Sequence, residues 1–134
     1  MYLIDTNIWL ELLLDQEKAE EVHRFFQQVE GRRLAITEFS LYSIGVILTR
    51  LKKDDVYADF LSDTVEDSGV VRICLDAPDL RLALQLRNQY KLSFDDAYQY
   101  VAAEKFGYIL ISFDSDFDRT PKGRRLPDIK TLEG

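Results

Sequence analysis

The chain has 134 residues, of which 46% are hydrophobic and 31% are charged, a size and composition that fit one soluble domain with a hydrophobic core. Six glycines and three prolines are too few for a disordered or collagen-like chain, and no apolar run reaches the length of about 18 residues needed to span a membrane. A formal net charge of −7 argues against a protein that binds nucleic acid by covering phosphates with basic side chains. We therefore expect a single domain over residues 1–134 with one functional site.

Short apolar runs alternate with segments of helical periodicity along the chain. In chain order they predict a strand at 2–4, helices at 8–14 and 19–29, a strand at 34–36, helices at 41–51 and 54–66, a strand at 70–75, helices at 78–90 and 94–106, a strand at 108–111, a polar loop at 114–125 and a last short strand at 129–132. This alternation predicts an α/β fold in which a mostly parallel sheet of about four to five strands is covered by helices on both faces.

Four single residues have a structural interpretation. Gly45 lies inside a predicted helix, where close packing is the expected reason for a glycine. Cys74, the only cysteine, lies in an apolar run and is expected to be a buried, reduced thiol. Trp9 is expected in the core or in a dimer interface. His23, the only histidine, is expected on the surface, and without a second histidine a two-histidine ribonuclease mechanism is excluded.

Acidic residues follow the predicted strands at the points where those strands end. Asp5 follows the first strand, Glu38 follows the second, and Asp114 and Asp116 follow the strand at 108–111. Asp96 lies in the first turn of the helix at 94–106, which begins at the same edge of the sheet. Ligands of open parallel sheets bind beyond the carboxyl ends of the strands, so these carboxylates are expected to share one pocket.

Clustered carboxylates repel one another unless a hard cation neutralises them. Oxygen ligands without nearby histidine or cysteine favour Mg²⁺ or Mn²⁺ over Zn²⁺, and such an ion can activate water against a phosphodiester. Each acid also has a purely structural interpretation. Asp5 can cap a helix, Asp96 can form a capping box with Ser93, and Asp114 and Asp116 can shape a turn.

Three segments resemble the signatures of the PIN domain family: YLIDTNIW at 2–9, LSFDDAYQYVAA at 92–103 and LISFDSDF at 110–117. The resemblance covers nearly the whole chain. It implies a PIN-like three-layer α/β/α fold, a single-strand-directed endoribonuclease that uses Mg²⁺ or Mn²⁺, and frequent homodimers. Many small members are VapC-type toxins, which are held inactive by a small antitoxin protein.

By motif, the resemblance implies that Asp5, Asp96, Asp114 and Asp116 hold the metal. Thr6 and Asn7 match positions that support the first acid, and Asp95 precedes the third.

The second motif departs from the family pattern. The family usually places a glutamate about six residues after the small hydroxyl residue that ends the second strand, and that count from Thr37 leads to Ser43. The only acid of this region is Glu38. Either Glu38 reaches the pocket from the strand end and completes the catalytic set, or the site is one carboxylate short.

The charge is unevenly distributed, since residues 119–134 carry a net +3 and residues 1–118 carry −10. The basic side chains just after the last acidic motif could bind RNA phosphates, contact an antitoxin or simply be solvated; they are Arg119, Lys122, Arg124 and Arg125.

The functional prediction is a metal-dependent endoribonuclease that acts on RNA. We also expect it to be cytoplasmic, because the N-terminus has no secretory signal pattern. Two alternatives are a phosphotransfer site with an aspartate after the first strand, and a non-enzymatic PIN-like module that binds RNA or protein.

Overall fold

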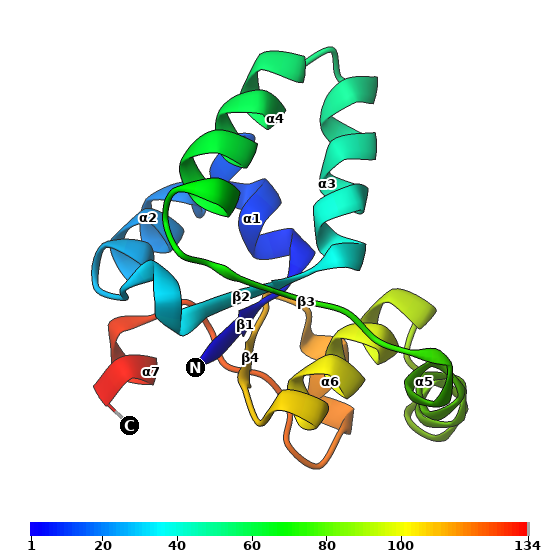
Figure 1. The fold of residues 1–134 in the computed structure, drawn as a ribbon. Coiled ribbons are helices and arrows are strands. Elements are labelled where there is room, and N and C mark those ends of the chain that lie inside the picture. Colours follow the sequence, from blue (N-terminus) through cyan, green and yellow to red (C-terminus); the bar gives the residue numbers. More distant parts are fainter. Residues whose placement is uncertain (134) are drawn as a thin grey trace.

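A computed structural model describes residues 1–133 and contains a four-stranded sheet, in which every strand pair is parallel (Figure 1). The strands are β1 (Tyr2–Ile4), β2 (Leu34–Thr37), β3 (Val71–Ile73) and β4 (Ile109–Ile111). Their order across the sheet is β3-β2-β1-β4. The parallel α/β architecture predicted from the sequence is therefore confirmed.

Helices cover both faces of this sheet. Figure 1 shows one group above the sheet, α1 (Thr6–Leu13), α2 (Ala19–Gln27), α3 (Glu38–Arg50) and α4 (Asp54–Phe60), and another below it, α5 (Ala77–Tyr90) and α6 (Phe94–Phe106). The short helices are η1 (Gly31–Arg33), the π-helical η2 (Leu61–Glu66), η3 (Ser115–Arg119) and α7 (Ile129–Glu133). Within residues 1–133, no helix combines the length and the apolar character needed to cross a membrane.

The strands are apolar on both sides because both faces are covered. In β1, Leu3 packs with Ala102 of α6, whereas its neighbours Tyr2 and Ile4 face the core formed with α1 to α4. A further buried residue on that side is Trp9, which is 2% exposed and contacts Phe26 and Phe60. Trp9 is thus a core residue.

The strand order reverses at β1. The chain runs outward from β1 through β2 to β3 and then returns to the other side of β1 as β4. The carboxyl ends of β1 and β4 therefore diverge into helices that lie on opposite faces, which leaves a crevice between them. This crevice is where the acidic segments after β1 and β4 lie.

Two local predictions are wrong. Residues 129–132 form part of helix α7 and not a strand, because Asp128 begins a helical turn: its side chain accepts a hydrogen bond from Lys130 N at 2.8 Å and its carbonyl accepts one from Thr131 N at 3.0 Å. Cys74 is exposed, because β3 is an edge strand that ends at Ile73, one residue before it.

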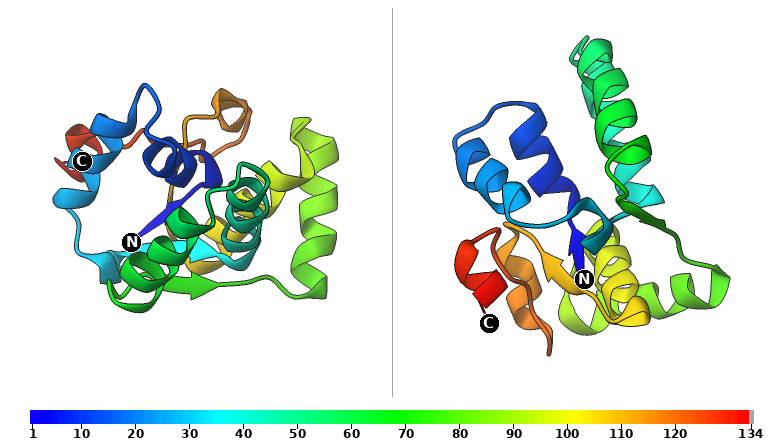
Figure 2. Two further views of the ribbon diagram at one scale, coloured as in Figure 1. Left: turned by 90° about the horizontal axis from the view of Figure 1, so that it is seen from above. Right: turned by 60° about the vertical axis from the view of Figure 1, so that its left-hand side comes forward.

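The packing role of Gly45 is confirmed. A Cβ atom at this position would lie 2.8 Å from the Tyr57 ring, whose hydroxyl donates a hydrogen bond to the Leu41 carbonyl at 2.7 Å. The glycine thus lets α4 approach α3. Figure 2 shows these two helices side by side, projecting away from the sheet.

Candidate metal centre

The residues expected to hold a metal lie at helix starts next to strand ends. Asp5 caps α1 and accepts a hydrogen bond from Thr6 N at 2.8 Å. Ser93 caps α6 through Asp96 N at 3.1 Å, which places Asp96 in the first turn. Asp114 caps η3 and accepts from Asp116 N at 2.9 Å. Asp5 and Asp114 therefore do cap helices, whereas the capping box expected between Ser93 and Asp96 is only half formed, because Ser93 caps α6 without a return bond from the Asp96 side chain. The same caps place these acids at one crevice.

Three carboxylates converge closely. Oxygen atoms of Asp96, Asp114 and Asp116, named here the acid cluster, all lie within 4.8 Å of one another. Burial raises the pKa of Asp96 to about 8, and the adjacent Asp114 and the charges of Asp5 and Asp116 act in the same direction. Without a cation, the Asp96 carboxyl group is therefore mostly protonated at neutral pH.

Asp5 lies beside the acid cluster and is more deeply buried, with 5% of its surface exposed. Burial raises its pKa, and three hydrogen bonds oppose this shift. Besides Thr6 N, the donors are Gln99 Nε2 at 3.0 Å to Oδ1 and Ser112 Oγ at 2.7 Å to Oδ2. Both carboxylate oxygens of Asp5 are thus held in place.

A cavity of about 220 Å³ opens between α1, α3 and α6 at this point. Its walls combine polar groups with three apolar side chains. The lining residues are Asp5, Thr6, Asn7, Leu10, Phe39, Ser43, Ile47, Asp95, Asp96 and Gln99.

Comparison with known families decides the classification, because the PIN domain family profile matches residues 2–123. The chain belongs to the PIN domain family. No curated protein sequence matches it.

Three solved structures share its fold. A toxin–antitoxin complex from Klebsiella pneumoniae has a TM-score of 0.75 and 22% identity, and the match covers 95% of this chain and 98% of that one. FitAcB from Neisseria gonorrhoeae has a TM-score of 0.77 and 19% identity, and the match covers 95% of this chain and 98% of that one. VapC20 of Mycobacterium tuberculosis, described as a sarcin-ricin loop cleaving toxin, has a TM-score of 0.79 and 17% identity, with 95% of this chain and 100% of that one covered.

The second motif of this PIN domain brings no carboxylate into the crevice. Glu38 is the first residue of α3, and its Oε1 accepts a hydrogen bond from Arg72 Nε of β3 at 3.1 Å. Ser43, at the position where the family usually has glutamate, lines the cavity. Glu38 is thus engaged by Arg72 and is not among the residues that line the cavity, and its catalytic role stays a prediction.

The supporting residues of this PIN domain act in different ways. Thr6 supports Asp5 through its backbone, and its hydroxyl lies 2.7 Å from Ser40 Oγ. Asn7 Nδ2 donates to Ser112 Oγ at 3.2 Å, so it reaches Asp5 through one intermediate. Asp95 is exposed at the rim of the cavity.

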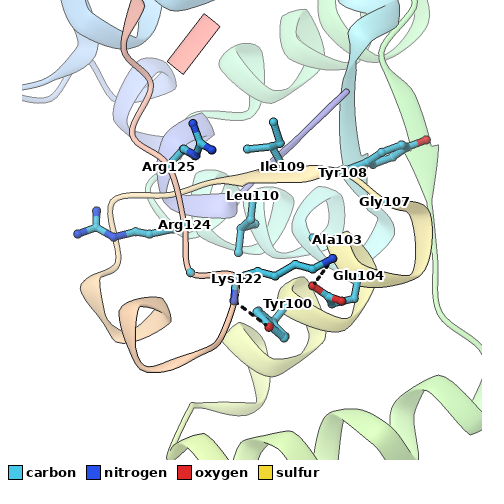
Figure 3. A pocket seen from close by; sticks show the side chains of 11 residues that line it. Tyr100, Ala103, Glu104, Gly107, Tyr108, Ile109, Leu110, Lys122, Arg124 and Arg125 are labelled. Carbon is cyan, nitrogen blue, oxygen red and sulfur yellow. Dashed lines mark hydrogen bonds and ion pairs between the residues drawn. The ribbon is translucent and has the colours of Figure 1, made fainter. Parts of the chain in front are cut away.

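Of the four basic residues, Arg119 contacts the acid cluster, and the other three lie at a different cavity. Arg119 pairs with Asp116 at 2.6 Å. Figure 3 shows Lys122 reaching Glu104, at 3.2 Å, in a separate cavity of about 330 Å³ at the other end of α6. Arg124, which pairs with Asp118 at 3.2 Å, and Arg125 line that second cavity but point away from its centre (Figure 3).

Sequence reasoning missed three residues that build the centre: Gln99, Ser112 and Ser40. Gln99 follows Asp96 by three residues on α6, and helical spacing puts such a pair on one face, so this signal was available. Ser112 directly follows β4 and donates a hydrogen bond to Asp5, which directly follows the neighbouring strand β1. The contact between Ser40 and Gln99, at 2.8 Å, joins residues 59 positions apart and has no local signal.

The residues present fit a hard divalent cation. The donors are carboxylate oxygens, and among the residues that the structure describes no histidine or cysteine joins the cluster. Burial and the neighbouring negative charges both raise the pKa of Asp96. A bound cation would offset these charges, so the electrostatics of the site favour one.

Proposed function

We propose that this chain is a Mg²⁺- or Mn²⁺-dependent endoribonuclease that cleaves single-stranded RNA, and that it is the toxin of a toxin–antitoxin pair. The observation that carries the proposal is the convergence of the acid cluster and Asp5 in one crevice of a PIN domain. A carboxyl group such as that of Asp96, whose pKa is raised by burial and by acidic neighbours, makes a poor structural element, but with those neighbours it makes a strong site for a cation.

In this proposal Asp5 and the acid cluster hold the ion together, with the more deeply buried Asp5 beside Asp96, Asp114 and Asp116. A divalent ion there lowers the pKa of water and offsets the negative charge of a phosphodiester. Asp96 loses its proton when the ion binds, because its pKa of about 8 reflects neighbouring charges as well as burial. Asn7 and Ser112 keep Asp5 oriented toward the ion. The apolar wall at Phe39 gives an RNA base a surface on which to pack.

The proposed biological role draws on the fold comparisons. The Klebsiella structure is a toxin–antitoxin complex and VapC20 is described as a toxin, and both share the fold of this chain over 95% of its length. We therefore propose a small antitoxin as partner, a cytoplasmic location and one domain over residues 1–134. For the homodimer that the family resemblance implies, the exposed apolar side chains of Tyr42, Val46 and Leu51 would supply buried surface.

RNA contacts by the basic segment are also proposed. Arg119, Lys122 and Arg124 are each paired with a carboxylate, so RNA phosphates would have to displace Asp116, Glu104 or Asp118. Among the side chains that the structure describes, none forms an ion pair with the exposed Arg125. We expect Arg125 to contribute most to RNA affinity.

A second candidate function is a catalytically weak or inactive PIN-like module that binds RNA or protein. One observation favours it: Glu38 is paired with Arg72, and Ser43 occupies the cavity wall, so the second motif adds no negative charge to the site. This function predicts RNA binding without cleavage.

The deciding experiment measures cleavage of a fluorescently labelled single-stranded RNA against Mn²⁺ and Mg²⁺ concentration. The wild-type protein should cleave only with metal, and Asp5→Asn and Asp96→Asn should each lower kcat/KM by about 100-fold or more. Asp59→Asn is the matched control, because Asp59 is an exposed aspartate on α4 that belongs to neither the acid cluster nor the cavity lining. Metal-dependent cleavage that survives in both active-site variants would refute the proposal, and bound but intact RNA would support the inactive module.

A further inference from the structure

Gln99 is an uncharged side chain at the centre of the site. It is 1% exposed, lies on α6 one turn after Asp96, and separates Asp5 from the segment where β2 joins α3. A buried amide is costly unless its donors and its acceptor are all satisfied. The hydrogen-bond partners of Gln99 therefore indicate its role in the site.

These hydrogen bonds allow only one orientation of the amide. Gln99 Nε2 donates to Asp5 Oδ1 at 3.0 Å and to Ser40 Oγ at 2.8 Å, while Oε1 accepts from Thr37 Oγ1 at 2.8 Å. The reverse orientation would place two acceptor oxygens against each other at Asp5. The Thr37 hydroxyl accepts from Ser40 N at 3.0 Å, and its oxygen lies 3.1 Å from Ser40 Oγ and 2.8 Å from Gln99 Oε1. We assign its single proton to the shorter of these two contacts, so that Thr37 donates to Gln99.

We propose that Gln99 is a positioning residue that fixes Asp5 for metal binding, and that Thr37 and Ser40 fix Gln99. The inference rests on the proposed function. In this chain the segment after β2 then serves the metal centre through a relay of neutral hydrogen bonds, Thr37 to Gln99 to Asp5. Glu38, the one acid of that segment near the strand end, is engaged by Arg72.

A neutral relay suits this site for a physical reason. The terminal torsion of an aspartate is soft, so a carboxylate keeps one plane only when partners hold both of its oxygens. Gln99 holds Oδ1 together with Thr6 N, and Ser112 holds Oδ2. A lysine or arginine in place of Gln99 would also hold Asp5, but its positive charge would compete with the cation.

The test measures Mn²⁺ affinity by titration calorimetry in the full-length protein. Gln99→Met keeps the length of the side chain and removes the amide, and the Mn²⁺ Kd should rise by about 10- to 100-fold, as for other residues that orient metal ligands. Thr37→Val removes the hydroxyl and should weaken binding by a smaller factor. Thr37→Ser retains the hydroxyl and should bind Mn²⁺ within about twofold of wild type.

Two controls separate positioning from a general loss of stability. Val22→Ala removes fully buried core volume on α2 and should lower Tm without changing the Mn²⁺ Kd. Gln89→Met makes the same chemical change at the end of α5, where the exposed amide hydrogen-bonds to its neighbour Tyr90, and should change neither Tm nor the Mn²⁺ Kd. A Gln99→Met protein that binds Mn²⁺ as tightly as wild type would overturn the inference.

A metal-free readout distinguishes failure of the relay from failure of the proposed function. By NMR, the Gln99 side-chain amide protons should exchange slowly with water, and their shifts should move in Asp5→Asn and in Thr37→Val. If wild type fails to bind Mn²⁺ but this amide is protected, the proposed function falls and the relay stands. Exchange as fast as that of the exposed Gln89 amide would refute the relay whatever the metal result.

Discussion

Mn²⁺ binding to the acid cluster should weaken steeply as the pH falls below 8. The pKa of Asp96 is raised to about 8, so its carboxyl group is mostly protonated at neutral pH and the cation must displace that proton. With one such proton, about half of the molecules have Asp96 ionised at pH 8 and roughly one in 100 at pH 6. The apparent Mn²⁺ Kd should therefore rise by about 50-fold between pH 8 and pH 6.

The same raised pKa sets the sign of the stability change in the metal-free protein. The pKa of Asp96 is near the ordinary aspartate value of 3.8 in the unfolded chain and about 8 in the folded chain. Between these values the folded state binds the proton more tightly than the unfolded state does. The contribution of Asp96 to the free energy of unfolding is therefore fully present below about pH 4 and is lost as the pH rises to about 8. Saturating Mn²⁺ should reverse this loss.

Titration calorimetry between pH 6 and pH 8, in two buffers of different ionisation enthalpy, measures the Mn²⁺ Kd and the number of protons released on binding. At the lower end of this range binding should release about one proton per Mn²⁺, and urea unfolding of the metal-free protein at several pH values should follow the predicted slope. Asp59→Asn serves as a control with unchanged behaviour, since Asp59 is an exposed aspartate on α4 outside the acid cluster. A Kd that changes less than about threefold from pH 8 to pH 6, without proton release, would refute the reasoning.

Three further predictions concern single substitutions. Ser43→Glu adds a carboxylate to the cavity wall and should tighten Mn²⁺ binding about tenfold while destabilising the metal-free protein; an unchanged Kd would contradict this. Arg119→Gln breaks the 2.6 Å pair with Asp116 and should tighten Mn²⁺ binding roughly three- to tenfold with little change in Tm, since the pair is about half exposed; weaker binding would count against it. Gly31→Ala places a Cβ atom against the Ser68 carbonyl and should cost about 1–3 kcal/mol in urea unfolding, an account that an unchanged midpoint would exclude.

The convergence of the acids was predictable because it follows from chain direction. Parallel strands end at one edge of a sheet, so residues that directly follow β1 and β4, such as Asp5 and Asp114, must lie near each other once the strands pair. Asp96 joins them because Ser93 starts α6 at that edge. The positions of these acids follow from where the strands and helices begin and end and from the parallel topology, and the periodicity of the sequence predicts both.

The partners of each side chain were not predictable in the same way. Glu38 follows a strand end as Asp5 does, yet it pairs with Arg72, because the neighbouring strand β3 places a guanidinium 3.1 Å away. Cys74 lies in an apolar run yet is exposed, since β3 is an edge strand. The ion-pair partner of a side chain and its exposure depend on which strand is adjacent in the sheet, and the sequence does not give that order.

The sequence by itself determined the α/β fold class, the family motifs and the set of acids at the strand ends, because each of these depends on patterns among residues that are close together in the chain. The tertiary structure alone decided that the pKa of Asp96 is raised, that Arg119 pairs with Asp116, and that Thr37 reaches Asp5 through Gln99. Hydrogen bonds and pKa shifts depend on distance and burial, and the residues involved are brought together only when the sheet and its two helical layers are assembled.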